Sequence, residues 1–360
     1  MKKICVVTTS LSKGGAEKSS AILTQLLVKL NYEVHILMTK DDLDYDFSGT
    51  LFNLEKEYGN ELSQVQKSKI LRTYFQKQQF DVIIDNRTRA GFFKEFILYH
   101  FIFKAKEKIA VVRSFYLRNY LPRHRFQAKL IYGNSTTLVA VSKGIEKAIH
   151  ENYSFKNVKQ IYNPVDVNII SEKAYDPIEM DTDFILWYGR IAEQVKNLTL
   201  LLEAFKTSNL PENHIKLCII GQGEDVGYLK EKIRTLDLEA HVHYIPFLKN
   251  PFSYVIRAKF TVLTSYYEGF PRVLIESLAC GTPVISVDCN SGPNEIIIHK
   301  YNGLLVENHD IKALANAFNT FIQNTSLYNS CKSHTTKSID KFTYKKIGSQ
   351  WQKLIDALKT

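Results

Sequence analysis

The sequence predicts an α/β protein made of two doubly wound parallel sheets. Short apolar runs alternate with longer stretches whose apolar residues recur at helical spacing, which is the pattern of parallel strands connected by helices. This alternation is interrupted around residues 161–183 and then starts again, so each half is expected to form its own sheet. A chain of 360 residues is long enough for two ordinary domains and too long for one simple core.

The first half is predicted to begin with a strand over residues 3–9, whose apolar run is typical of a parallel strand covered on both faces. A loop over residues 10–15 leads to a helix over 16–30, and a strand over 32–38 completes a β-α-β unit. The remaining predicted elements are strands at 82–85, 109–112 and 137–141 and helices at 61–78 and 92–103.

The second half follows a polar, acidic stretch, and residues 166–182 are predicted to be the interdomain linker between domains at 1–165 and 183–340. Its apolar runs predict strands at 184–188, 216–220, 242–245, 260–263, 284–287 and 303–306, and a helix at 311–323. An amphipathic helix over 343–358 closes the chain.

Composition favours an ordinary cytoplasmic protein. The chain is 45% apolar and 23% charged, no apolar run is long enough to span a bilayer, and the first residues lead directly into a strand rather than a signal peptide. The five cysteines show no closely spaced ligand pairs, so we expect reduced thiols, with neither a disulfide framework nor a zinc site.

The formal net charge of +10 favours an anionic partner, for which nucleic acid, anionic lipid and a phosphorylated substrate are all candidates. Basic and aromatic side chains alternate between Arg113 and Lys129. Such a mixture suits a membrane interface or a lipid-diphosphate acceptor, and a solvated helix face is the alternative.

Two carboxylates stand out in the stretch from Ser265 to Asp288. Glu268 follows an apolar strand, and Glu276 lies eight positions later in a short helix that starts next to a proline and stops near Gly281. The free N–H groups at the start of that helix suit a phosphate. The alternative is that both glutamates are solvated surface carboxylates.

This Glu-x7-Glu spacing, with Gly269, Phe270 and Pro271 after the first glutamate, resembles the nucleotide-sugar site of the family 4 glycosyltransferases. These are retaining enzymes of the GT-B architecture, in which two Rossmann-like domains face each other across a cleft. The resemblance implies that Glu268 contacts the donor sugar and that Glu276 contacts the ribose hydroxyls. It also implies that Gly269, Phe270 and Pro271 lie beside the donor.

Two cations are predicted to bind the donor diphosphate. Arg190 ends the first strand of the second domain, and Lys196 opens the next helix, where they resemble the Gly-Arg and Lys-Asn pairs of the family. Transfer of a sugar leaves negative charge on the departing diphosphate, which fixed positive groups stabilise. The resemblance therefore implies that Arg190, Lys196 and Glu268 are the catalytic residues.

Gly14 and Gly15 lie between the first strand and helix, where adjacent glycines let the backbone approach a bound group. The family has a Gly-Gly loop at this position facing the donor, and an ordinary turn is the alternative reading. The resemblance also implies that residues 1–165 form the acceptor side, that 183–340 form the donor side, and that residues 341–360 return to the first domain.

The chain departs from the family at two positions. Arg113-Ser114 stands where many relatives carry a histidine near the donor sugar, and Pro246 replaces a usual glycine near the expected base. The segment from Ser291 to Ile297 also resembles a family segment, but it is left outside the predicted site because it suits a helix cap equally well.

The function implied is retaining transfer of a hexose or N-acetylhexosamine from a nucleoside-diphosphate sugar, with uridine diphosphate as the expected nucleotide. The implied acceptor is a glycan or a polyprenyl-diphosphate-linked glycan in surface-polysaccharide synthesis, reached by peripheral contact with the inner face of the membrane. We expect no metal, no other cofactor and no nucleic acid. A nucleotide-sugar epimerase of the same architecture and a noncatalytic anion- or nucleic-acid-binding protein remain alternatives.

Overall fold

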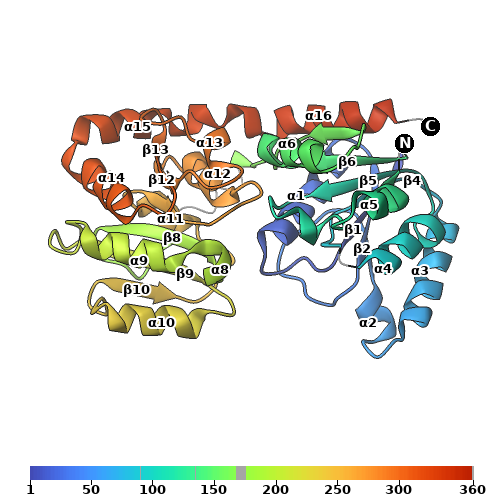
Figure 1. The fold of residues 1–360 in the computed structure, drawn as a ribbon, viewed down its shortest axis with the longest axis horizontal. Helices are drawn as coiled ribbons and strands as arrows, with labels where there is room; N and C mark the ends of the chain where they lie inside the picture. The colour runs from blue at the N-terminus through green and yellow to red at the C-terminus, as the bar shows by residue number, and fades with distance from the viewer. Residues whose placement is uncertain (90, 134, 168–175, 359–360) are drawn as a thin grey trace. The chain divides into compact units, whose positions relative to one another are not determined.

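The structure is a computed structural model that describes residues 1–89, 91–133, 135–167 and 176–358 (Figure 1). The chain divides into two compact units, the first made of Met1–Pro164 with Tyr344–Thr360 and the second of Val165–Thr343. Each unit is a parallel sheet covered by helices, which confirms the predicted fold class. The predicted linker, residues 166–182, falls partly on residues 168–175, which lie outside the described part of the chain.

The described part of unit 1 contains a seven-stranded parallel sheet in the order β3-β2-β1-β4-β5-β6-β7. Its strands are β1 (Lys3–Thr8), β2 (Glu33–Met38), β3 (Thr50–Asn53), β4 (Phe80–Asp85), β5 (Ala105–Val112), β6 (Thr136–Ala140) and β7 (Val158–Gln160). The five predicted strands are confirmed. The two short strands at the sheet edges, β3 and β7, were not predicted.

The helices of unit 1 are α1 (Gly15–Lys29), α2 (Leu54–Tyr58), α3 (Gln64–Gln78), α4 (Phe92–Ile97), the π-helical turn η1 (Leu98–Ile102), the 3-10 turn η2 (Leu117–Asn119), α5 (Arg125–Tyr132), α6 (Lys143–Asn152) and α16 (Tyr344–Ala357). The predicted helix at 92–103 is thus α-helical only in its first half. The final helix, α16, packs in unit 1: the Lys2 Nζ donates to the Ile355 carbonyl at 2.7 Å, and the Tyr32 hydroxyl donates to Asp356 at 2.9 Å.

The described part of unit 2 contains a six-stranded parallel sheet in the order β10-β9-β8-β11-β12-β13. Its strands are β8 (Phe184–Arg190), β9 (Lys216–Gln222), β10 (Val242–Ile245), β11 (Thr261–Leu263), β12 (Val284–Val287) and β13 (Gly303–Val306), all predicted from the sequence. Its helices are α8 (Glu193–Lys196), α9 (Leu198–Thr207), α10 (Val226–Thr235), α11 (Phe252–Arg257), α12 (Arg272–Ala279), α13 (Pro293–Ile296), α14 (Ile311–Gln323), α15 (Thr325–Ser338) and the 3-10 turn η3 (Asp340–Phe342).

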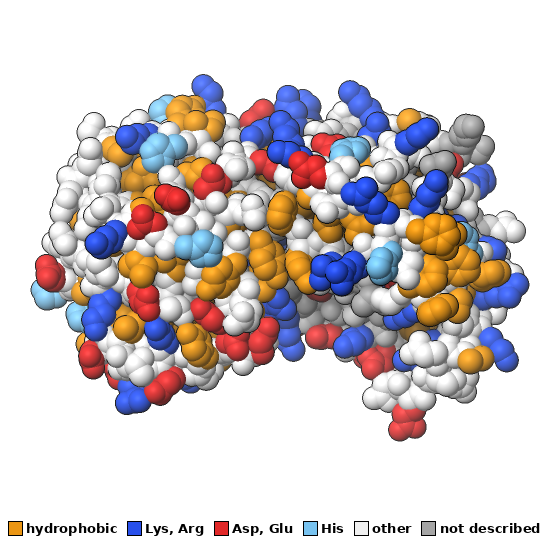
Figure 2. All heavy atoms as spheres, in the orientation of Figure 1, with side chains coloured by type: hydrophobic (Ala, Val, Ile, Leu, Met, Phe, Trp, Pro, Cys, Tyr) orange, Lys and Arg blue, Asp and Glu red, His pale blue; other side chains and the backbone are white. Residues whose placement is uncertain are grey.

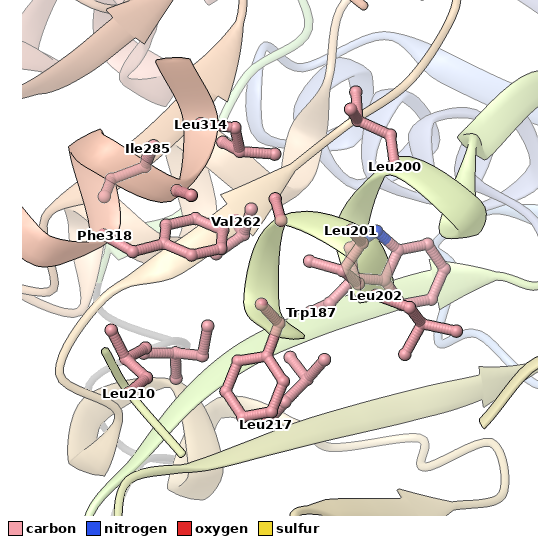
Figure 3. Packing of buried hydrophobic residues seen from close by; sticks show 14 of the residues in the cluster. Trp187, Leu200, Leu201, Leu202, Leu210, Leu217, Val262, Ile285, Leu314 and Phe318 are labelled. Atoms are coloured by element: carbon pink, nitrogen blue, oxygen red, sulfur yellow. The ribbon is translucent and has the colours of Figure 1, made fainter. Parts of the chain in front are cut away.

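The main core of unit 2 lies between the sheet and helices α9 and α14 (Figure 3). Trp187 of β8 is 1% exposed and packs in one cluster with Leu201 of α9 and Phe318 of α14, both fully buried. Such complete burial of large side chains contributes about 1.5–3 kcal/mol for each one removed from water. The core therefore fixes β8 and α9, which flank the short helix α8 that ends at Lys196.

The strand order places a topological switch point in each sheet. In unit 2 the chain leaves β8 toward β9 on one side, whereas β11 pairs with β8 on the other. In unit 1 the chain leaves β1 toward β2, and β4 pairs with β1 on the opposite side. Open α/β sheets bind ligands at the carboxyl ends of two such strands, because the connections diverge there. The loops after β8 and β11, and those after β1 and β4, are therefore the first places to look for a site.

Candidate functional site

Lys196 and Glu268 form an ion pair at the switch point of unit 2. The Lys196 Nζ donates to Glu268 Oε1 at 2.6 Å, and the Ser265 hydroxyl donates to the same oxygen at 2.6 Å. The two side chains are 19% and 11% exposed, so the pair is mostly shielded from water but not sealed. The interpretation of Glu268 as a solvated surface carboxylate is therefore wrong.

The backbone holds this pair in place by joining the loops after β8 and β11. The Thr264 hydroxyl donates to the Lys196 carbonyl at 2.9 Å, and the Tyr266 N–H donates to the Val195 carbonyl at 2.9 Å. Asn197 adopts a left-handed conformation with φ 49° and caps α9, its side chain accepting from the Leu200 N–H at 3.2 Å. The Lys-Asn motif thus places a cation at the turn between two helices.

Arg190 is the last residue of β8 and is exposed. Within the described residues its guanidinium forms no ion pair with an acidic side chain, so it is available to a bound anion. Its strand pairs with β9, where a Cβ on Gly221 would collide with the Gly189 carbonyl and a Cβ on Gly223 with the Ile191 carbonyl. Both glycines of this Gly-x-Gly, at the end of β9 and just after it, are therefore needed because the two backbones approach too closely for a Cβ.

Glu276 is buried in α12 and paired with Arg272 one turn earlier. The Arg272 Nη2 and Nε donate to Glu276 Oε1 at 3.0 and 3.2 Å, and the two side chains are 8% and 3% exposed. Burial, with the Glu276 carboxylate nearby, raises the pKa of the Tyr188 phenol, which donates to the Val273 carbonyl at 2.9 Å. The surface-carboxylate interpretation is wrong for Glu276 too.

The turn between the two glutamates is buried and packed. The Phe270 ring, which is 5% exposed, lies edge-on to Phe342 with 5.1 Å between ring centroids. The Ser291 hydroxyl donates to the Gly269 carbonyl at 2.9 Å, and Gly292, with φ 106°, leaves no room for a Cβ beside Pro271. Residues 291–292, which we left outside the predicted site, therefore support the glutamate turn, and their Ser-Gly-Pro sequence after a strand was the signal for it.

Gly14 and Gly15 lie at the N-terminus of α1, with Gly14 as its capping residue. The Glu17 carboxylate lies against Gly14, so an acidic group already occupies this end of the helix dipole. Gly15 has no neighbouring atom within 4 Å of the position that a Cβ would take. A side chain at position 15 would therefore touch no other part of the described chain, but it could collide with a ligand bound there.

Sequence reasoning missed a buried charged cluster at the switch point of unit 1. The Arg87 Nη2 donates to Asp85 Oδ2 at 2.9 Å and to Glu95 Oε2 at 3.0 Å, and the Tyr99 hydroxyl donates to Asp85 Oδ2 at 3.0 Å. Arg89 donates to the carbonyls of residues 85, 87, 111 and 120. The signal was the run Asp-Asn-Arg-Thr-Arg, which begins with the last residue of β4 and holds two arginines next to an aspartate.

The ionisation of this cluster follows from its burial and its cations. Burial alone would raise the pKa of the Asp85 carboxyl, but the Arg87 and Arg89 guanidiniums outweigh it and hold that pKa below its ordinary value. For Glu95 burial prevails over Arg87 and raises the pKa. The two arginines thus favour the ionised form of Asp85 more strongly than that of Glu95.

Arg113, which we predicted to stand where many family members carry a histidine, is held by two amides. Its Nη1 donates to the Asn163 Oδ1 at 2.6 Å and its Nη2 to the Asn86 Oδ1 at 2.9 Å. This chain thus places a permanently charged guanidinium at the carboxyl end of β5. A histidine at this position would change protonation near neutral pH, whereas the arginine does not.

Three further properties bear on the chemistry. In residues 1–89, 91–133, 135–167 and 176–358, no three histidine, cysteine, aspartate or glutamate side chains are grouped closely enough to hold a metal ion. In the same ranges no helix combines the length and the apolar character that crossing a membrane requires. All five cysteines are free thiols.

Two family models together match residues 13–338 of the chain. Residues 13–169 match the model described as Glycosyltransferase Family 4, and residues 170–338 match the one described as Glycosyl transferases group 1. This chain belongs to the family 4 glycosyltransferases. The family that the Glu-x7-Glu motif pointed to is therefore confirmed.

Named relatives agree with this membership. An N-acetylgalactosamine-N,N'-diacetylbacillosaminyl-diphospho-undecaprenol 4-alpha-N-acetylgalactosaminyltransferase of Campylobacter jejuni is 28% identical over 360 residues, which cover 95% of this chain and 96% of that protein. The lipopolysaccharide 1,6-galactosyltransferase of Escherichia coli K12 is 30% identical over 190 residues, 51% of this chain and 52% of that protein.

Solved structures show the same fold. TarM of S. aureus, in a complex with fondaparinux, alpha-GlcNAc-glycerol and UDP, superposes with a TM-score of 0.80 at 15% identity, covering 99% of this chain and 100% of that one. HepE of Anabaena in complex with UDP-glucose gives a TM-score of 0.79 at 19% identity with the same coverage. The glycosyltransferase has the GT-B fold.

Proposed function

We propose that this glycosyltransferase moves a hexose or N-acetylhexosamine from a UDP-sugar, with retention at the anomeric carbon, to a polyprenyl-diphosphate-linked glycan. The observation that carries the proposal is the Lys196–Glu268 ion pair at the switch point of unit 2. The exposed Arg190 ends β8, the strand that precedes the short helix with Lys196. UDP in the complexes of proteins with the same fold supports the choice of nucleotide.

The chemistry assigns a role to each group of unit 2. When the bond between the anomeric carbon and the β-phosphate oxygen breaks, its electron pair stays on the diphosphate, whose added negative charge must be neutralised. Arg190 and Lys196 supply fixed positive charge, and the N-terminus of α12, which has no side-chain cap, supplies N–H groups. We assign Glu268 to the donor sugar and Glu276 to the ribose hydroxyls.

Phe270 and Pro271 contribute in a different way from the charged groups. The Phe270 side chain packs on Phe342 and Pro271 lies against Gly292, so we assign the donor contacts of Gly269, Phe270 and Pro271 to their backbone. Gly14 and Gly15 remain our candidates for donor contacts from unit 1.

The acceptor is proposed to bind unit 1, at the inner face of a membrane. Two relatives, both from Campylobacter jejuni, are named for acceptors in which a glycan is attached to diphospho-undecaprenol, one of them aligning over 95% of this chain and the other over 100%. Such an acceptor carries a diphosphate and a lipid, which the cationic, aromatic segment from Arg113 to Lys129 suits chemically.

Donor binding and turnover test this proposal. We expect UDP-sugars to raise the unfolding temperature of the full chain, because a ligand that binds only the folded state stabilises it. Arg190→Ala should abolish this shift and the slow hydrolysis of the donor. The matched control is Arg234→Ala, which changes an exposed arginine of α10 that pairs with Glu231 on the same helix.

Three results would count against the proposal. If UDP-sugars raise the unfolding temperature of Arg190→Ala as much as that of the wild type, Arg190 does not bind the diphosphate. Release of a sugar with inverted anomeric configuration, followed by NMR, would exclude retention. Conversion of the donor sugar to its epimer without any acceptor would favour the epimerase instead.

A further inference from the structure

Large apolar side chains face solvent along one part of unit 1. Phe93, Ile97 and Phe101 recur every four residues along α4 and η1 and are 78%, 46% and 53% exposed. On α5, Phe126 and Leu130 are also four residues apart, and they are 71% and 39% exposed. An isolated exposed apolar residue is ordinary, but five on adjoining helices need a reason.

These helices form one continuous surface. The ring Nε2 of His100 on η1 hydrogen-bonds with the Leu130 carbonyl of α5 at 2.7 Å. Beneath it, Tyr99 and Tyr132 pack edge to face with 4.9 Å between ring centroids, and both are buried. Figure 2 shows hydrophobic side chains gathered with basic ones over the region where Figure 1 draws α4 and α5. We call this the α4–α5 surface.

The core of unit 1 does not account for the exposed residues. The inward side chains of the same helices already fill it, with Glu95, Leu98 and Ile102 of α4 and η1 and Ile131 of α5 all buried. Glu95 is paired with Arg87, so the polar interior is satisfied as well. Phe93 meets the half-buried Phe92 ring of the same helix, with 5.2 Å between ring centroids, but it and Phe126 still expose most of their apolar area to solvent.

The segment that carries these residues is strongly basic. Residues 91–133 contain nine lysine or arginine residues and two glutamates, which is +7 of the chain's formal +10. One of the glutamates, Glu95, is buried, and the other, Glu107, lies half-buried on β5. The exposed cations of α4, α5 and their flanking residues are Lys94, Lys104, Arg123, Arg125 and Lys129.

Exposed apolar side chains among an excess of cations fit an anionic lipid surface. The exposed Glu151 of α6, whose carbonyl accepts from Arg125 at 3.2 Å, lies beside Lys147 and leaves this excess in place. Each lysine or arginine near such a surface contributes attraction, and aromatic side chains partition into the boundary between headgroups and acyl chains. A second copy of the chain would bring like charges together, and a nucleic-acid duplex, which is bound through its phosphates, would leave the phenylalanines without a partner.

We propose that the α4–α5 surface docks the enzyme on anionic bilayers, with Phe93, Phe101 and Phe126 in the lipid and the surrounding cations on headgroup phosphates. The proposal deepens the proposed function, since a polyprenyl-linked acceptor is presented in such a bilayer, but the surface is defined by unit 1 alone. Docking by electrostatic attraction and shallow insertion requires no membrane-spanning helix.

Co-sedimentation of the full chain with vesicles tests the proposal. We expect binding to equimolar phosphatidylglycerol–phosphatidylcholine vesicles, weaker binding as salt rises, and little binding to phosphatidylcholine alone. The double variant Phe93→Ser with Phe126→Ser should lower the partition coefficient at least tenfold, as should Arg125→Gln with Lys129→Gln. The matched controls are Val65→Ser with Ile298→Ser, which are 65% and 56% exposed, and Lys69→Gln with Lys77→Gln on α3, and both should bind as the wild type does.

Several outcomes would overturn the docking surface. One is wild-type vesicle binding by both α4–α5 double variants, and another is equal binding to neutral vesicles. A third is a dimer in sedimentation that the Phe93 and Phe126 changes dissociate, because it would make the surface a contact between copies. UDP binding by the same variants separates this proposal from the donor site, since docking variants should bind UDP normally.

Discussion

Removal of the Glu276 carboxylate should destabilise unit 2 strongly. The Arg272 and Glu276 side chains are 8% and 3% exposed and are joined by two hydrogen bonds at 3.0 and 3.2 Å. Taking away one member of a buried pair leaves the other charge without its partner in a poorly solvated place, which costs about 3–5 kcal/mol. For a domain of this size 1 kcal/mol shifts the unfolding temperature by about 2–4 °C, so Glu276→Ala should lower it by roughly 6–20 °C.

A second variant separates this stability effect from the assigned ribose contact. Arg272→Met combined with Glu276→Leu replaces both charges by apolar side chains of similar volume, a change that is often neutral or stabilising in a protein interior. Calorimetry should therefore show an unfolding temperature close to that of the wild type. Titration of the same protein with UDP should nevertheless show at least a tenfold loss of affinity, because no carboxylate is left for the ribose hydroxyls.

Two results would refute this reasoning. The unfolding temperature of Glu276→Ala could lie within about 2 °C of the wild type, a difference of roughly 1 kcal/mol. In that case the Glu276 carboxylate contributes much less to stability than the buried ion pair predicts. Wild-type UDP affinity in the folded double variant would show that Glu276 has no part in binding the nucleotide. Glu276→Gln, which keeps the size and one acceptor oxygen, should fall between these variants in stability.

Two further predictions concern unit 1. Gly15→Ala should leave stability unchanged or raise it by up to about 1 kcal/mol, because no atom lies within 4 Å of the new Cβ. The same change should weaken donor binding tenfold. Unchanged donor binding by titration would exclude the glycine loop from the site. The pKa of Asp85 is held low by Arg87 and Arg89 against the effect of burial, so its stabilisation is present above about pH 4 and is lost as the pH falls toward the lower folded-state pKa. Urea unfolding from pH 7 to 3 should show this loss, and Asp85→Asn should flatten it; an identical pH profile in the variant would contradict the assignment.

The strands and motif loops could be predicted because their signals are local. The core strands of both sheets are runs of apolar residues long enough to be read directly, such as Ile4–Val7 and Leu217–Ile220. The edge strand β3 is only four residues long and partly exposed, so its sequence carries no burial pattern. Its pairing with β2 is decided by the rest of the sheet.

The buried charges could not be predicted for a physical reason. Arg87, Arg89, Glu95 and Arg272 are residue types that are almost never fully buried, so each by itself is read as a surface residue. They become interior only because the fold supplies carboxylates and carbonyls as partners. The exposed Phe93 and Phe126 are the converse, since a helical spacing of apolar residues predicts a buried face and not a solvent-facing one.

The central claim is that Arg190 and Lys196 neutralise the diphosphate of the donor, and the contribution of the phosphates to binding tests it directly. Titration of the wild type should give a far lower Kd for UDP than for uridine. In the double variant Arg190→Ala with Lys196→Ala the two ligands should bind with nearly equal affinity, provided that circular dichroism shows a folded protein. If the double variant still prefers UDP over uridine as strongly as the wild type does, the diphosphate binds elsewhere and the account of this site is wrong.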